Sequence, residues 1–119
     1  MELEQKKAVQ REILVGFWKV HILHHAASGP VVGQWMLTEL RRHGYEVSPG
    51  TLYPMLHRLE KLGWLRSEVD PEKGSKARRS FYLTEKGREI LEIVRKCLGE
   101  LRLEVGQSTK DSESKDKEK

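Results

Sequence analysis

Apolar residues at helical spacing mark a short amphipathic segment in the middle of the chain, from Ser48 to Gly63. Ser48 is expected to cap its first turn, Pro49 suits the first helical position, and Gly63 suits the left-handed residue after the last turn. One apolar stripe lies between these signals, formed by Leu52, Met55, Leu56, Leu59 and Leu62. The pattern predicts one helix that buries a single face.

The opposite face of this helix carries hydrogen-bond donors, cations and an aromatic ring, and it contains no acid. Such a face suits a nucleic acid, because a helix N-terminus can bind phosphate and basic side chains can contact the backbone or base edges. The residues that we expect to contact DNA from this helix are Ser48, Pro49, Gly50, Thr51, Tyr53, His57, Arg58 and Lys61.

Two further helices are predicted before this segment. The first covers residues 2 to about 27 and has two apolar stripes, one of Val9, Ile13, Phe17 and Val20 and one of Leu14, Trp18 and Ile22. This band is wider than one core requires, so we expect contact with both the chain's own domain and a partner. Residues 31–43 form the second helix, and the short link through Gly44 predicts a helix-turn-helix.

The hydrophobic pattern changes after Gly63. Residues 64–69 and 80–83 are typical of short strands, and the turn-rich connection between them predicts a β-hairpin. The connection holds two acids and four cations, and the four cations are further candidates for DNA contact: Lys73, Lys76, Arg78 and Arg79. A helix-turn-helix followed by a basic hairpin is a winged helix, so the predicted fold class is mainly α with a small β-hairpin.

A last helix is predicted over residues 85–105, with Thr84 as its cap. Its apolar residues have heptad spacing, which favours pairing with another helix over burial in a broad core. We therefore expect a homodimer whose interface comprises Ile13, Phe17, Trp18, Val20, Leu91, Val94, Leu98, Leu101 and Val105. Residues 106–119 contain no apolar side chain and are expected to be a disordered charged tail, which leaves residues 1–105 as one domain.

Charge, cysteine content and the lack of long apolar runs narrow the possible classes of protein. The net charge of +4 belongs to residues 1–105, because the four lysines and four acids of the tail cancel. Cys97 is the one cysteine, which excludes an intramolecular disulfide and fits a reducing cytoplasm. The N-terminus lacks the apolar region of a signal peptide and no apolar run is long enough to span a membrane, so we expect a cytoplasmic protein with no membrane partner.

The central helix also carries a resemblance. Its sequence, SPGTLYPMLHRLEKLG over residues 48–63, is similar to the hallmark of the PadR family of transcriptional regulators. Supporting matches are Gly29-Pro30 followed by Gly33, Gly44-Tyr45, and the stretch FYLTEKG over residues 81–87. The chain departs from the family at residues 32–34, which are Val-Gly-Gln where His-Gly-Tyr is common. The single short C-terminal helix resembles the small-subunit type.

This resemblance implies a winged-helix regulator of the repressor type, with a dimer built from the N- and C-terminal helices and a small-molecule effector in some members. With one recognition helix per subunit, the two major grooves would lie about 34–36 Å apart on an inverted-repeat operator. Two alternatives stay open from the residues alone: a winged helix that binds proteins, and a metal-responsive regulator that uses His21, His24 and His25.

Other candidate chemistry is sparse. Trp18 is the best candidate for an effector pocket between subunits, although core packing is the simpler role for any tryptophan. Cys97 is expected to be a small core or interface residue. The sequence has no nucleophile–base pair, no paired carboxylates in an apolar setting and no Walker-type phosphate loop, so we expect no enzyme activity, no cofactor and no dedicated metal site.

Overall fold

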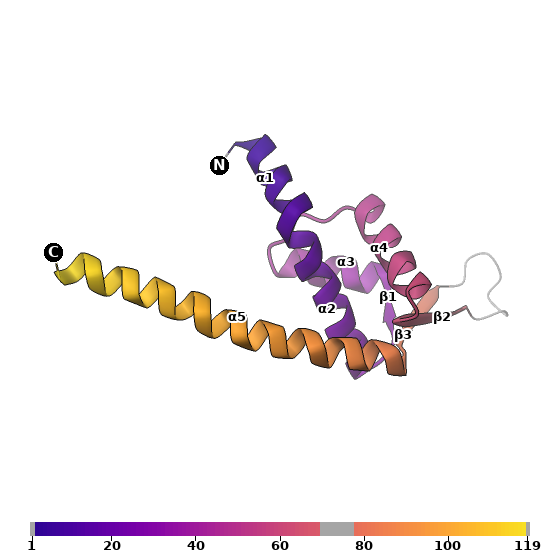
Figure 1. The fold of residues 1–119 in the computed structure, drawn as a ribbon. Helices are drawn as coiled ribbons and strands as arrows, with labels where there is room; N and C mark the ends of the chain where they lie inside the picture. Colours follow the sequence, from indigo (N-terminus) through magenta and orange to yellow (C-terminus); the bar gives the residue numbers. More distant parts are fainter. Residues whose placement is uncertain (1, 70–77, 119) are drawn as a thin grey trace.

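The structure is a computed structural model that describes residues 2–69 and 78–118. Helices pack around one small antiparallel sheet, and Figure 1 shows their arrangement. The elements in chain order are α1 (Leu3–Val9), η1 (Gln10–Leu14), α2 (Val15–Ser28), β1 (Val31–Val32), α3 (Gly33–Arg42), α4 (Pro49–Lys61), β2 (Leu65–Val69), β3 (Arg79–Leu83) and α5 (Glu85–Glu118). The mainly α fold class with a small β component is therefore confirmed.

The first three elements form the single N-terminal helical rod that the sequence predicted (Figure 1). Its middle turn, η1, is a π-helix, a wider turn that rotates the residues after it relative to those before it. The described side chains of α1 and η1 include no buried residue, whereas α2 buries Trp18, Ile22, Leu23 and Ala26. Only the second half of the rod therefore belongs to the core.

The predicted helix over residues 31–43 begins two residues late, at Gly33, because Val31 and Val32 form a strand. This strand pairs antiparallel with β3 in the register Val31 to Phe81, which gives a three-stranded sheet in the order β1-β3-β2. The sequence predicted only the hairpin of β2 and β3. A two-residue strand is too short to show alternation, so its pattern could not be distinguished from the start of a helix.

The core lies where α2, α3 and α4 meet one face of the sheet. The apolar stripe of α4 is buried as predicted at Leu52, Met55, Leu56 and Leu59, and Leu62 is half-buried. It packs with Met36 and Leu40 of α3, Ile22 of α2 and Phe81 of β3. This burial fixes α4 on the domain and leaves its opposite face toward solvent.

Thr84 caps α5 as predicted, because its Oγ1 accepts a hydrogen bond from the Gly87 N–H at 3.0 Å. The same hydroxyl donates to the Gly63 carbonyl at 2.6 Å, and the Thr84 N–H donates to the Trp64 carbonyl at 3.1 Å. The turn after α4 and the start of α5 are thus tied together, which sets the direction in which α5 leaves the domain.

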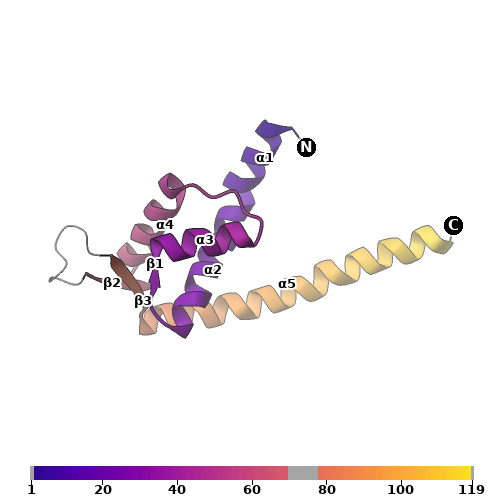
Figure 2. The same cartoon turned by 180° about the vertical axis from the view of Figure 1, so that it is seen from behind.

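The length of α5 differs from the sequence-based prediction. The helix continues past residue 105 to Glu118, through the segment that the sequence predicted to be disordered. No proline occurs in that segment and Gly106 alone does not end the helix, so nothing in the local backbone chemistry forces a stop. Figures 1 and 2 show α5 crossing α2 near its own start and then projecting far beyond the domain. None of the helices within the described ranges is both long and apolar enough to cross a membrane.

Candidate nucleic-acid interface

The outer face of α4 is the surface opposite its buried stripe. Every residue that the sequence assigned to this face is exposed, namely Ser48, Pro49, Gly50, Thr51, Tyr53, His57, Arg58 and Lys61. Pro49 occupies the first helical position and Gly63, with φ of +83°, lies just past the last turn, so both boundary signals are confirmed. The outer face of α4 is therefore turned to solvent, and its two aromatic side chains also contact the domain: Tyr53, 39% exposed, at Gly33, and His57 at Phe81.

The prediction that the Ser48 side chain caps α4 is wrong. It has the extended conformation of an N-cap residue, but its side chain makes no capping hydrogen bond to the backbone. Its Oγ donates instead to Thr51 Oγ1 at 3.2 Å, while its carbonyl accepts from the N–H groups of Thr51 and Leu52 at 3.0 Å. The two hydroxyls are paired at the exposed N-terminus of α4, where the positive end of the helix dipole favours an anion.

Tyr53 reaches from α4 to the first turn of α3. Its ring occupies the space that a β-carbon at residue 33 would need, so the contact depends on glycine there. Gly33 is buried under this ring. Gly33 is the residue of the 32–34 segment that this chain shares with the His-Gly-Tyr pattern, so the departures at Val32 and Gln34 leave this contact in place.

The wing consists of β2, β3 and their connection. Arg78 and Arg79 are exposed at its described end, whereas Lys73 and Lys76 lie outside the described residues. The Arg79 Nη1 donates to Ser67 Oγ at 2.9 Å, and Ser67 Oγ donates to Glu60 Oε2 at 2.5 Å. This chain of bonds joins the wing to α4 and engages the carboxylate closest to the outer face of α4.

A groove of about 520 Å³ runs between α4, the start of α3 and the wing. The His57 ring lies at its floor, 6.3 Å from the Phe81 ring and nearly perpendicular to it. None of the described residues that line the groove is acidic; they are Val32, Gly33, Gln34, Tyr53, His57, Arg78, Arg79 and Phe81. Four predicted DNA-contacting residues thus share one hollow, and Gln34 joins them although the sequence analysis gave it no role.

The nine residues predicted for the dimer interface divide into two groups. Ile13, Phe17, Leu98, Leu101 and Val105 are exposed, and Val20 and Val94 are half-buried. Trp18 and Leu91 are only 2% exposed, because both belong to the core of their own subunit. The stripe of α2 that contains Trp18 faces inward and the stripe that contains Phe17 faces outward, which corrects the assignment of Trp18 and Leu91.

The assignment of Trp18 to an effector pocket between subunits stays a prediction. A cavity of about 320 Å³ lies beside Trp18, between α2, α5 and Tyr45. Its lining contains Phe17 but not Trp18, and the full set is Phe17, Val20, His21, His24, Tyr45, Leu91, Arg95 and Leu98. The Trp18 indole packs edge to face on Tyr45 with ring centroids 5.9 Å apart. Trp18 therefore contacts a residue that lines the cavity without lining it itself. Cys97, predicted to be a small core or interface residue, is exposed on α5 and lies outside the core.

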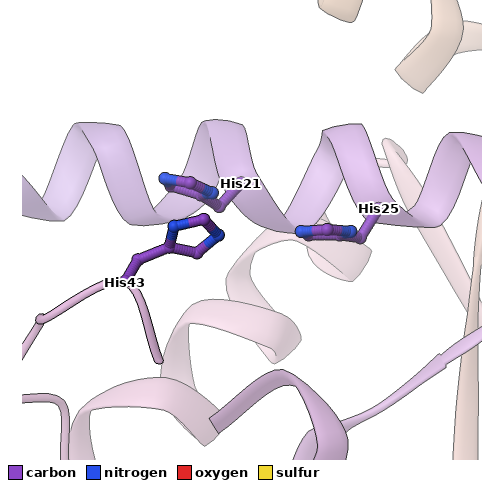
Figure 3. Close-up of side chains that lie close together, drawn as sticks. All are labelled: His21, His25 and His43. Carbon is purple, nitrogen blue, oxygen red and sulfur yellow. The ribbon is translucent and has the colours of Figure 1, made fainter. Parts of the chain in front are cut away.

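The histidines form a different set from the one the sequence suggested. His21 and His25 come together with His43, which follows α3, and a ring nitrogen from each lies within 4.8 Å of the others (Figure 3). His24, the third member of the sequence-based set, is not part of this group. The sequence analysis missed His43 because the crossing of α2 and α3, and not local spacing, brings it near.

Together, the helix pair α3 and α4, the three-stranded sheet and the wing define a winged-helix protein. A family model described as "Transcriptional regulator PadR-like family" matches residues 22–93, more than half of the chain. The chain belongs to the PadR family of transcriptional regulators. Proteins of this family bind DNA and are generally non-enzymatic.

Individual relatives agree with this assignment. The transcriptional regulator Rv3488 of Mycobacterium tuberculosis is 54% identical over 92 residues, which span 76% of this chain and 85% of that protein. A PadR-like transcription factor from Bacteroides fragilis superposes with a TM-score of 0.72 at 25% identity, covering 84% of this chain and 97% of that one. A PadR family regulator from Eggerthella lenta gives a TM-score of 0.71 at 29% identity, covering 89% and 96%.

Proposed function

We propose that this protein is a sequence-specific repressor that binds an inverted-repeat operator as a homodimer. The observation that carries the proposal is the exposed, acid-free outer face of α4, which continues into a groove bordered by Arg78 and Arg79 of the wing. The B-DNA major groove is about 12 Å wide and admits one helix. Each subunit would insert α4 there and lay the wing along the adjacent backbone.

The residues of this surface have distinct roles in the proposal. The paired hydroxyls of Ser48 and Thr51 lie at the positive end of α4 and suit a phosphate. Arg58 and Lys61 lie toward the other end of the helix and can reach base edges or the opposite backbone. Tyr53 and His57 lie between these ends and face the groove shared with the wing.

Dimer formation is proposed through the outward stripes of the N-terminal rod and α5. Phe17 and Leu101, 40% and 50% exposed, are typical of these stripes, and such large apolar side chains in a row favour burial against a partner.

The same helices border the 320 Å³ cavity, whose lining is mostly apolar with His21, His24 and Arg95 as polar groups. We assign this cavity to a small aromatic or apolar effector whose acidic group would compete with Glu92, which pairs with Arg95 at 2.9 Å.

The direct test is selection of bound sequences from a random duplex library with the purified full-length protein. An enriched inverted repeat with half-sites about one helical turn apart supports the proposal, and its affinity should fall steeply with salt. Weak binding with no enriched sequence would contradict it and would favour a protein-binding winged helix. Repression is then tested with a reporter gene placed behind the selected operator.

A further inference from the structure

Three imidazoles meet where α2 passes the end of α3. His21 and His25 are one helical turn apart on α2, and His43 follows the last turn of α3. The His21 and His43 ring centroids are 5.0 Å apart, and the His21 and His25 rings stack at 6.4 Å. Figure 3 shows the three rings in the space between the two segments, and one nitrogen of each lies within 4.8 Å of the others.

A carboxylate borders this cluster. Glu39 Oε1 lies 3.3 Å from His43 Nε2 and 3.7 Å from His25 Nε2. Arg42 donates to both oxygens of Glu39, at 2.6 and 3.1 Å, and this hydrogen bonding is the main reason that the Glu39 pKa falls to about 2. A histidine that binds a metal ion generally has such a carboxylate partner, which orients the ring and offsets the charge of the ion.

Two rings of the cluster, those of His21 and His25, have lowered pKa values. Burial lowers the pKa of His21 below its usual value, and the neighbouring histidines, His43 first, lower it further. Burial likewise lowers the pKa of His25, followed by the effect of His24.

We propose that His21, His25 and His43 bind one zinc-class divalent metal ion, with Glu39 as the carboxylate partner, at the junction of α2 and α3. Imidazole nitrogens suit Zn²⁺, Cu²⁺ and Ni²⁺. Tetrahedral zinc with Zn–N bonds of 2.0–2.1 Å places ligand nitrogens about 3.3 Å apart. The nitrogens must therefore approach by up to about 1.5 Å from the 4.8 Å limit, which side-chain rotation of an exposed His43 and two half-buried rings can supply.

The position of the site gives the ion a structural role. It would link α2, which lies in the rod proposed for dimerisation, to α3, the first helix of the helix-turn-helix. His21 also lines the 320 Å³ cavity and contacts Tyr45, with ring centroids 5.6 Å apart. Metal binding would therefore fix one wall of that cavity. The site itself does not depend on DNA binding or on the dimer.

The test uses the full-length protein stripped with EDTA and titrated with ZnCl₂ in isothermal calorimetry. We expect one ion per chain and an upward shift in Tm that EDTA reverses. His21→Ala and His43→Ala should each weaken the affinity at least tenfold, whereas the matched controls His24→Ala and His57→Ala should leave it unchanged. Co²⁺ in place of zinc should give the visible spectrum of a tetrahedral site in the wild type and lose it in His43→Ala.

Several results would overturn the site. Affinity kept in His43→Ala would remove His43 from the ligand set. Affinity lost equally in His24→Ala would show that the ligands are not the proposed three histidines. Loss of binding in Cys97→Ser would show that the exposed thiol is the true ligand. Circular dichroism and the metal-free Tm of each variant check folding. If His43→Ala does not fold, His43→Gln replaces it, and unchanged zinc affinity in that variant contradicts the proposal.

Discussion

The Tyr53 ring of α4 fills the space beside the α-carbon of Gly33 in α3, where any β-carbon would overlap it. The two helices of the DNA-binding unit are thus in contact through a tyrosine on one and a glycine on the other. We predict that Gly33→Ala displaces the Tyr53 ring toward solvent, at a cost of up to about 1 kcal/mol of unfolding free energy because the overlapping atoms are the far end of a partly exposed side chain. Denaturant unfolding measures the change, and operator affinity should fall with it.

The matched control for this substitution is Gly99→Ala in α5, where a β-carbon meets no other atom within 4 Å. There alanine should stabilise the helix by about 0.5–1 kcal/mol through its higher helix propensity. In the double variant Gly33→Ala, Tyr53→Ala the overlap is gone, so most of the lost stability should return. A Gly33→Ala protein with both the stability and the operator affinity of the wild type would mean that Tyr53 does not rest on α3.

Thr84 provides a second stability prediction. Its hydroxyl accepts from the Gly87 N–H and donates to the Gly63 carbonyl, so Thr84→Ala leaves one donor and one acceptor without their partner. We expect a loss of about 1–2 kcal/mol, the range measured for N-cap residues. Thr84→Ser keeps the hydroxyl and should recover most of this loss in the same thermal or denaturant measurement. Equal losses in both variants would assign the effect to the methyl group.

The outer face of α4 predicts how binding responds to salt. If Arg58 and Lys61 neutralise phosphates, Arg58→Ala with Lys61→Ala should lower the slope of log affinity against log salt by about two, because each lost contact lowers it by about one. Fluorescence anisotropy on the selected operator from low to moderate salt measures this slope. Lys96→Ala removes a cation from α5 and should leave the slope unchanged. The same reduction in both proteins would indicate a general charge effect.

The exposed stripe on α5 predicts a change of assembly. Leu101→Asp places a charge in the proposed interface and should convert the dimer to monomers in light scattering at micromolar concentration. Ile93→Asp is the control, because Ile93 is similarly exposed on α5 but lies off the heptad spacing. We expect Ile93→Asp to remain dimeric. A Leu101→Asp protein that is still a dimer would exclude this face of α5.

Much of the fold follows from signals carried by neighbouring residues. The apolar stripe, Pro49 and Gly63 define α4 locally, so its bounds and its buried face could be predicted. Thr84 defines the start of α5 in the same way. Strand β1 could not be predicted, because Val31 is a strand residue only through pairing with Phe81, fifty residues later in the chain.

In the candidate sites, too, features set by local spacing could be predicted, whereas features set by tertiary packing could not. Exposure of the outer face of α4 follows from one stripe, and the structure agrees with it at every residue. The rod had two stripes, and only the tertiary packing decides that Trp18 faces inward while Phe17 faces outward. His43 joins His21 and His25 because α2 crosses the end of α3, an arrangement that helical spacing cannot reveal.

Strand β1 also connects the N-terminal rod to the wing, the two regions that we propose contact different partners. It directly follows α2 and is paired along its length with β3, whose first residue is Arg79 of the wing. A tilt of α2 would therefore reach β3 through the backbone pairing of β1, in addition to the core contacts of Trp18 and Ile22. The backbone pairing of Val31 and Val32 with β3 thus couples the position of the N-terminal rod to the position of the wing.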